Sequence, residues 1–248
     1  MIEARNISKT FANHEVLKDV TVRFEKGQTN LIIGQSGSGK TVLMKCLVGL
    51  YNADSGEIAY DDRIFSEMSE KEKTDFRKEF GMLFQGGALF DSQTVQENIM
   101  FPLSMFTNQS YEEKLDRVNF CLKRVNLENS NHLYPSELSG GMIKRVAIAR
   151  AISVNPKYLF CDEPNSGLDP RTAGVIDNLI SEITEEYGMT TIINTHDMNS
   201  VLEIGTSIAF IHEGNLWWTG NKDEVLHSDN KELNNFIFAS ELTKRLKK

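Results

Sequence analysis

This sequence has no long apolar run, few cysteines and no excess of positive charge. No stretch approaches the roughly 18 consecutive apolar residues that span a bilayer, and residues 1–11 lack the apolar core of a signal peptide. The 3 cysteines, an odd number at unrelated spacings, favour a reducing compartment over a disulfide framework or a zinc site. With 35 acidic and 27 basic residues and a formal net charge of -8, no nucleic-acid partner is expected. A membrane-spanning protein, a secreted scaffold and a histone-like binder are thereby disfavoured.

The composition that is present is that of a globular α/β protein. The 248 residues are 40% hydrophobic and 25% charged, and a chain of this length buries roughly three-quarters of its unfolded surface, enough for one large core. Alternating apolar and polar residues from Ile2 to Phe24, with a break at 12–15, predict two antiparallel strands. The short apolar strand Thr29–Ile33 then leads into a glycine-rich loop and a helical pattern over Val42–Leu50.

The middle of the chain has a different pattern from either end. From Ser66 to Tyr134, charged helical segments surround a less regular stretch, Gln85–Thr107, which predicts a mostly helical insertion. The α/β pattern then returns, with apolar strands at Lys157–Asp162 and Thr190–Asn194, a helical stripe of Val175, Ile176, Leu179, Ile180 and Ile183, and a hairpin of Ser207–Ile211 and Leu216–Thr219.

A glycine-rich loop lies between an apolar strand and a helical pattern, as the P-loop motif requires. Its glycines let the backbone wrap a phosphate, while amide hydrogens and the helix N-terminus supply donors. Lys40 adds positive charge for the β and γ phosphates, and the Thr41 hydroxyl is suited to Mg²⁺. The loop consists of Gly34, Gln35, Ser36, Gly37, Ser38, Gly39, Lys40 and Thr41.

Two carboxylates end the apolar strand that begins at Lys157. Asp162 is suited to hold Mg²⁺, and Glu163 to polarise a water that attacks a phosphate. A solvated acidic loop is the alternative interpretation, but a P-loop in the same chain favours the functional one. The pair therefore points to nucleotide hydrolysis.

A second anion-binding helix terminus is predicted in the second half of the chain. Ser139 occupies an N-cap-like position, and Gly140 and Gly141 precede the helical run Ile143–Ile152. Paired glycines weaken a helix start, but they bring amide hydrogens close to an anion. Because one nucleotide cannot easily use both this terminus and the P-loop of one compact chain, we expect two copies to share each nucleotide.

Together these motifs resemble the ATP-binding subunit of ABC transporters over about residues 2–225. The P-loop resembles the family's Walker A motif, Tyr158–Glu163 its Walker B motif with the catalytic glutamate, and Leu138–Met142 its signature. Further motifs follow the family's order: Gln85 resembles the Q-loop glutamine, Ser166–Asp169 the D-loop, His196 the switch histidine, and Phe11 the aromatic residue that stacks on adenine.

The resemblance implies an ATPase that uses ATP and Mg²⁺. Glu163 would be the general base, His196 would support the γ-phosphate, and Gln85 would help to position the water. Thr41, Gln85 and Asp162 would hold Mg²⁺. ATP would be bound by Phe11, Gly34, Gln35, Ser36, Gly37, Ser38, Gly39, Lys40, Thr41 and Val42, and by Ser139, Gly140, Gly141 and Asp169.

The same resemblance implies a domain organisation and partners. Residues 1–226 would form one ATPase domain, a RecA-like α/β core with an antiparallel β subdomain and a helical subdomain at about 86–155, followed by a tail at 227–248. A second copy would complete the ATP sandwich, and Gly86–Asn98 would receive a short helix from an integral membrane permease. The chain would therefore work in the cytoplasm, on the inner face of the cell membrane.

The tail contains one apolar cluster and a basic end. The cluster is Phe236, Ile237 and Phe238, which either packs on the chain's own core or reaches a neighbour. The basic segment Leu242–Lys248 is expected to fray.

Two departures from the commonest ABC pattern bear on the cargo. The signature ends in Met142 where glutamine is usual, and the Q-loop continues as Gln85-Gly86-Gly87-Ala88-Leu89-Phe90. Both resemble the ATPases of lipid transporters of the maintenance-of-lipid-asymmetry type, which work with MCE-domain proteins. The resemblance implies phospholipid transport with an MCE-domain lipid-binding partner.

Three other functions remain open at this point. Within the family, the alternative is the ATPase of another system, such as an amino-acid importer or a lipoprotein-releasing complex. A non-transport ABC protein acting on ribosomes or DNA usually carries two cassettes or a long coiled-coil insertion, and this sequence has neither. A P-loop small-molecule kinase would leave Leu138–Met142 unexplained.

Overall fold

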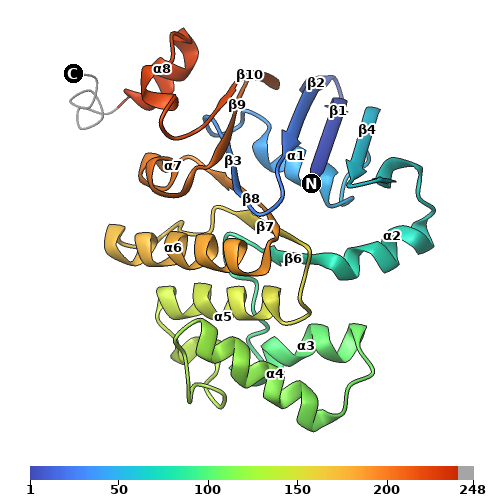
Figure 1. The fold of residues 1–248 in the computed structure, drawn as a ribbon, viewed down its shortest axis with the longest axis vertical. Coiled ribbons are helices and arrows are strands. Elements are labelled where there is room, and N and C mark those ends of the chain that lie inside the picture. Colours follow the sequence, from blue (N-terminus) through green and yellow to red (C-terminus); the bar gives the residue numbers. More distant parts are fainter. Residues whose placement is uncertain (240–248) are drawn as a thin grey trace.

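The computed structural model describes residues 1–239, which form two β-sheets and a separate group of helices (Figure 1). A four-stranded antiparallel sheet lies at one end of the molecule, a six-stranded sheet lies in the middle, and helices α3, α4 and α5 stand at the opposite end. The predicted fold class, an α/β cassette with an antiparallel β part and a helical part, is confirmed.

The antiparallel sheet is formed by the amino-terminal strands and two later ones. The predicted antiparallel pair is confirmed, but the chain folds back at residues 12–13 rather than over 12–15, so that Ile2 pairs with Phe24 and Phe11 with His14. The last two strands were not predicted, because their apolar runs are short and their stability depends on pairing with β1. The sheet order is β2 (His14–Phe24), β1 (Ile2–Phe11), β4 (Ser55–Tyr60) and β5 (Arg63–Ile64).

The six-stranded sheet is parallel except for the last strand. It contains the three predicted buried strands and the predicted hairpin, and it also contains a strand at Phe80–Leu83 that pairs in parallel with Tyr158–Cys161. This strand lies inside the segment predicted to be a helical insertion, so the prediction that the insertion begins at Ser66 is wrong. The order is β10 (Asn215–Gly220), β9 (Ser207–His212), β3 (Thr29–Ile33), β8 (Thr190–Thr195), β7 (Tyr158–Asp162) and β6 (Phe80–Leu83).

Helices connect the strands and build the helical end of the molecule. Within residues 1–239 no helix is both long enough and apolar enough to cross a bilayer. The α-helices are α1 (Lys40–Leu47), α2 (Glu70–Phe76), α3 (Val95–Phe106), α4 (Tyr111–Arg124), α5 (Gly140–Ile152), α6 (Pro170–Tyr187), α7 (Met198–Ile204) and α8 (Lys231–Ile237). Short 3-10 turns lie at η1 (Phe65–Glu67), η2 (Arg77–Glu79), η3 (Pro135–Glu137) and η4 (Val225–His227).

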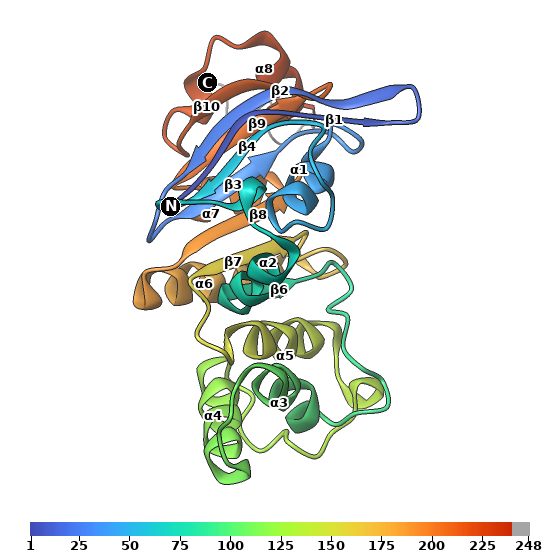
Figure 2. The same ribbon diagram turned by 90° about the vertical axis from the view of Figure 1, so that its right-hand side faces the viewer.

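Helix α3 corrects the expectation that Gln85–Thr107 is irregular. Thr94 accepts a hydrogen bond from the Glu97 amide, and the Glu97 side chain accepts from the Thr94 amide, which completes a capping box at the start of the helix. Pro102 lies inside α3 and obscures the helical pattern in the sequence. Helices α3 and α4 pack beneath α5, which lies next to the six-stranded sheet (Figure 2).

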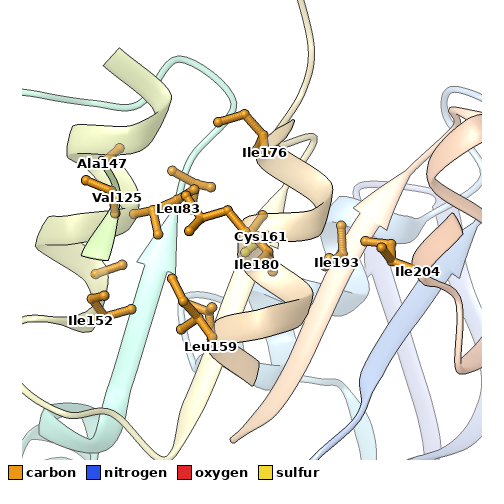
Figure 3. Packing of buried hydrophobic residues seen from close by; sticks show 14 of the residues in the cluster. Leu83, Val125, Ala147, Ile152, Leu159, Cys161, Ile176, Ile180, Ile193 and Ile204 are labelled. Carbon is orange, nitrogen blue, oxygen red and sulfur yellow. The ribbon is translucent and has the colours of Figure 1, made fainter. Parts of the chain in front are cut away.

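The larger of two apolar cores joins the six-stranded sheet to helices α5 and α6 (Figure 3). Four members of the predicted stripe on α6 are buried, but Val175 is 52% exposed because one residue step turns a helix by about 100°. Leu50 is 55% exposed, since α1 ends at Leu47 rather than continuing through the predicted pattern. The second core fills the space between the two sheets and α1.

The carboxyl-terminal helix packs on the chain's own core. Leu233, Ile237 and Phe238 are buried within the larger apolar cluster, and Phe236 packs against it. The Phe236 ring lies 5.5 Å from the Phe210 ring of β9. The apolar cluster of the tail therefore contacts its own core, while the predicted basic end, Leu242–Lys248, lies outside the described residues.

Candidate functional site

The P-loop joins the carboxyl end of β3 to the start of α1. Gly34 and Gly39 have φ values of 149° and 111°, in the region that favours glycine. A Cβ atom on Gly34 would lie 2.2 Å from the Ile211 carbonyl oxygen, and one on Gly39 would lie 2.9 Å from that of Val16. Glycine is therefore required at both positions, because backbone from β2 and β9 approaches the loop closely.

Lys40 is buried at the centre of this loop. Its Nζ donates to the carbonyl oxygens of Gly34 at 2.7 Å and Gln35 at 2.9 Å. Burial lowers the pKa of Lys40, and the negative charges of Glu163 and Asp162 act in the opposite direction. The ammonium group is thus held by backbone oxygens within the electrostatic reach of two carboxylates.

The loop fits a polyphosphate on two further observations. The Ser38 hydroxyl oxygen is buried and has no hydrogen-bond partner among the described residues, and buried hydroxyls are normally paired. The loop also leads directly into the N-terminus of α1, where unpaired amide hydrogens favour an anion. A phosphate chain would supply acceptors to these groups and to Lys40.

The carboxyl end of β7 brings a carboxylate to the first turn of α1. The Thr41 hydroxyl lies 3.4 Å from Asp162 Oδ1, which also accepts a hydrogen bond of 3.0 Å from the buried side chain of Asn194. A hydroxyl and a carboxylate suit Mg²⁺, which binds few protein oxygens when phosphates and waters complete its shell. No group of three or more His, Cys, Asp and Glu side chains suited to a metal occurs in residues 1–239. Thr41 and Asp162 therefore fit a metal shared with a nucleotide.

Glu163 and His196 form a pair at the ends of neighbouring strands. His196 Nδ1 lies 2.8 Å from Glu163 Oε1, and the Glu163 amide donates to the Asn194 carbonyl oxygen at 3.0 Å. The histidine is largely exposed while the glutamate is mostly covered. Two of the three predicted catalytic side chains thus contact each other directly, at the carboxyl edge of the sheet.

Gln85 follows β6 and links this edge to the helical group. Its Nε2 donates to the Ser166 hydroxyl at 3.2 Å, and its carbonyl oxygen accepts from the buried Lys144 of α5. Burial lowers the pKa of Lys144. Arg150, also on α5, donates to the Gly87 and Ala88 carbonyl oxygens, each at 2.7 Å. Helix α5 therefore holds the segment that follows Gln85 by its backbone.

Many of these groups line one cleft with a volume of about 890 Å³, but the predicted site residues Gly34, Ser38 and Asp162 do not line it. The cleft is also lined by residues that the sequence alone did not single out as site residues. They are His14 and Val16 of β2, Asp197–Asn199 after His196, and residues at the end of α8. The predicted residues that line it are Gln35, Ser36, Gly37, Gly39, Lys40, Thr41, Val42, Gln85, Glu163 and His196.

The model of the family described as "ABC transporter" matches residues 17–166, which include the P-loop, Gln85 and the acidic pair. The chain belongs to the ABC transporter family. It is an ATP-binding cassette with ATPase chemistry.

Curated relatives match nearly the whole cassette. The methionine import ATP-binding protein MetN of Campylobacter jejuni is 35% identical over 97% of this chain and 76% of its own length. A mycobacterial relative from Mycobacterium leprae, named "Probable ribonucleotide transport ATP-binding protein mkl", is 35% identical over 95% of this chain and 68% of its own length. The relatives are thus transport ATP-binding proteins with different named cargoes.

A solved structure has the same fold. The dimeric bacterial ABC transporter cassette MJ0796 is 32% identical, with a TM-score of 0.82 over 90% of this cassette and 99% of its own chain. A second dimeric structure of that protein represents a post-hydrolysis state with ADP and phosphate. The fold of the present chain is therefore one that binds and hydrolyses nucleotide as a dimer in a relative.

The signature residues lie away from the cassette's own cleft. Ser139 caps α5 by accepting a hydrogen bond of 3.3 Å from the Met142 amide, and Asp169 caps α6 by accepting from the Arg171 and Thr172 amides. A Cβ atom on Gly140 would lie 3.4 Å from the side chain of Leu168, so the signature and the D-loop are neighbours. Neither Ser139, Gly140, Gly141 nor Asp169 lines the cleft of the same chain.

Phe11 also lies outside the cleft lining. It is 39% exposed, packs edge to face on Tyr51 at a centroid distance of 5.2 Å, and has the Lys9 ammonium 5.4 Å from its ring centre. The structure does not bring Phe11 to Lys40, whereas His14 and Val16, farther along the same hairpin, do line the cleft.

Asn194 and Lys144 had weak signals in the sequence. Asn194 is a polar residue at the end of a predicted buried strand, and Lys144 is a charged residue that α5 buries. Such exceptions to a pattern indicate a specific partner, but only the folded structure identifies those partners as Asp162 and Gln85.

Proposed function

We propose that two copies of this cassette bind two ATP molecules between them and drive an integral membrane permease from the cytoplasmic face of the cell membrane. The observation that carries this proposal is the convergence of Lys40, Thr41, Glu163 and His196 on one cleft away from the signature, with Asp162 held next to Thr41. A second copy would supply Ser139, Gly140 and Gly141 to the same nucleotide. ATP binding would then favour the closed dimer, because only that state contacts the γ-phosphate from both sides.

Each residue around the cleft has a distinct role in this proposal. Lys40 binds the β and γ phosphates, and Glu163 accepts a proton from the attacking water. His196 holds the Glu163 carboxylate and supports the γ-phosphate, while Gln85 positions the water. Mg²⁺, when bound near Thr41 and Asp162, would neutralise charge on the phosphates.

The relatives support an amino acid as the cargo better than they support a phospholipid. Methionine import ATP-binding proteins match this chain over nearly its whole length. ATP-binding subunits contact permeases rather than cargo, so the similarity reports on the type of permease that the cassette fits. On this basis the partner would be an amino-acid permease that receives a short helix near Gly86–Asn98.

Phospholipid is a second candidate, because the two departures from the common pattern lie together in the fold. A Cβ atom on Gly87 would lie 2.9 Å from the side chain of Ile143, the neighbour of Met142. Gly87 and Ile143 are therefore close neighbours, so the start of the segment that would meet the permease lies beside the end of the signature. The two departures, which resemble those of lipid transporters with MCE-domain partners, thus lie near each other in the fold.

Complementation of a deletion strain tests the two cargoes. In cells that lack this gene, wild type is expected to restore uptake of labelled amino acid, with methionine as the first probe, whereas Glu163→Gln is not. Distribution of phospholipid between membranes is measured in the same strains. The amino-acid assignment would be overturned if the deletion left amino-acid uptake unchanged but altered the phospholipid distribution. Co-purification of an MCE-domain protein with the tagged chain would then favour phospholipid as the cargo.

A further inference from the structure

A buried polar network lies behind the catalytic pair, within the larger apolar core. Asp177 of α6 is 2% exposed, and its Oδ2 accepts hydrogen bonds from Ser200 Oγ at 2.7 Å and from Asn165 Nδ2 at 3.2 Å. Asn165 Nδ2 also donates to Ser200 Oγ at 2.8 Å. Ile176 and Ile180, the neighbours of Asp177 on α6, are packed among buried apolar side chains (Figure 3). The three polar groups thus form a closed triangle inside an apolar environment.

This network is energetically expensive. Burial raises the pKa of Asp177 to about 6, and repulsion from Asp197 and Glu203 acts in the same direction. Its second oxygen, Oδ1, is buried without a hydrogen-bond partner among the described residues. An apolar residue of similar size would avoid both penalties. A function beyond packing would account for a carboxylate at this position.

The two partners of Asp177 belong to the two segments that carry the catalytic pair. Asn165 lies two residues after Glu163, in the loop whose Ser166 accepts from Gln85. Ser200 lies on α7, whose capping residue Asp197 directly follows His196. No residue of the triangle contacts the P-loop through a hydrogen bond in the part of the chain that the structure describes. The network therefore connects the Glu163 loop to the His196 loop without contacting the residues that bind phosphate.

We propose that Asp177 is a positioning residue that, through Asn165 and Ser200, fixes the spacing of Glu163 and His196 for hydrolysis. The Glu163–His196 contact of 2.8 Å lies where the paired strands β7 and β8 end, and the network joins the two loops that continue from them. When the acceptor at Asp177 is removed, the loops lose their common anchor on α6 and are joined only by the Asn165–Ser200 hydrogen bond, so the pair spends less time in the hydrolytic geometry. ATP binding persists, because Lys40 and the P-loop are held by separate contacts.

The test is steady-state hydrolysis and nucleotide binding by the full chain. Asp177→Leu fills the space and removes the acceptor, and it is expected to lower kcat about 10-fold while the Kd for ATP changes less than about 2-fold. Asp177→Asn keeps an amide oxygen that can accept from both partners, so it is expected to restore kcat to within about 3-fold of wild type. Ser200→Ala, which removes one corner with a small change in volume, is expected to lower kcat in the same way.

Thr184→Val is the matched control on the same helix. Thr184 is also buried and hydrogen-bonded, to Thr191 at 2.6 Å, but it does not contact either catalytic loop. Its kcat is expected to stay within about 2-fold of wild type. Wild-type kcat in both Asp177→Leu and Ser200→Ala, or equal losses in Thr184→Val, would overturn the positioning role.

The proposal rests on the roles proposed above for Glu163 and His196, and it is independent of the cargo. If Glu163→Gln retains turnover, the role of Glu163 as base fails. If that variant is inactive while Asp177→Leu and Ser200→Ala remain fully active, only the role of Asp177 fails.

Discussion

Glu163 is held in an unusual backbone conformation next to the P-loop. Its φ of 49° lies in the left-handed region, which costs a residue other than glycine of the order of 1 kcal/mol or more. Two contacts stabilise the position, one from the Glu163 amide to Asn194 and one from its carboxylate to His196. Strained residues of this kind cluster at catalytic sites, which is consistent with the role proposed for this carboxylate.

Replacing the carboxylate by an amide is therefore expected to separate binding from hydrolysis. Glu163→Gln should lower phosphate release at least about 100-fold, because the amide cannot accept the proton of the attacking water. ATP affinity should change little, as measured by equilibrium binding of a fluorescent ATP analogue. Lys40→Ala is the contrasting variant and should weaken nucleotide binding itself; undiminished hydrolysis in Glu163→Gln would refute the assignment of the base.

The raised pKa of Asp177, about 6, predicts how stability changes with pH. The folded chain holds this proton to a higher pH than the unfolded chain, whose carboxyl titrates near 4. The free energy of unfolding therefore loses up to about 3 kcal/mol at this site as the pH rises from about 4 to 6.

Urea unfolding at pH 4.5 and at pH 7 checks this prediction. Wild type should lose stability relative to Asp177→Leu between the two pH values, and the comparison cancels the effects of other carboxyl groups. A stability difference between the two proteins that does not depend on pH would show that the carboxyl group titrates normally.

At the level of elements, local sequence encodes several helix starts through capping contacts. The capping boxes at Thr94 and Ser110 begin α3 and α4, and Ser139 caps α5, all through contacts between residues three apart. The prediction for α5 was right for this reason, and α3 could have been found from its capping box despite Pro102. Strand β6 could not be found so easily, because it is short and is stabilised by pairing with a strand more than 70 residues away.

Helix α8 shows how much stability one terminal element can contribute. Leu233 is fully buried in the larger core, although it lies in the segment predicted to be a tail. Leu233→Ala is expected to lower the free energy of unfolding by about 2–4 kcal/mol, because it leaves a cavity that the surroundings fill only in part. Lys231→Ala, at the exposed start of the same helix, should change it by less than about 0.5 kcal/mol.

Denaturant unfolding monitored by circular dichroism compares these two variants with wild type. Equal stability of Leu233→Ala and wild type would mean that α8 does not pack on its own core in solution.

For the whole molecule, the separation of the signature from the cleft leads to a prediction about assembly. With ATP, Glu163→Gln should form a dimer, measured by light scattering after size exclusion. Adding Gly140→Asp should abolish that dimer, because a negative charge at the signature would repel the γ-phosphate bound by the other copy. The substitution should not disturb the fold of the monomer. A helix N-terminus is stabilised by an acidic residue, and the new Cβ atom would lie 3.4 Å from its nearest neighbour, which is ordinary contact.

ATP binding by the Gly140→Asp monomer is the control and should remain close to that of wild type. A dimer that persists in the double variant would show that the signature does not meet the nucleotide of a second copy.

The sequence by itself determined the P-loop, the acidic strand end, the capped signature helix and the family to which they belong. These features depend on residues that are close together in the chain, so their chemistry is visible as a local pattern. Lys40 and Ser139 contact the backbone of their own segments, which explains why their places could be predicted.

Only the tertiary structure decided which distant groups meet. It brought Asn194 to Asp162, Lys144 to the Gln85 carbonyl, and Asp177 to the loops of Glu163 and His196. It also placed Phe11 outside the cleft and packed α8 on the core. Each of these contacts joins segments that are separate in the chain, and each is set by strand order and helix packing, which a local pattern does not contain.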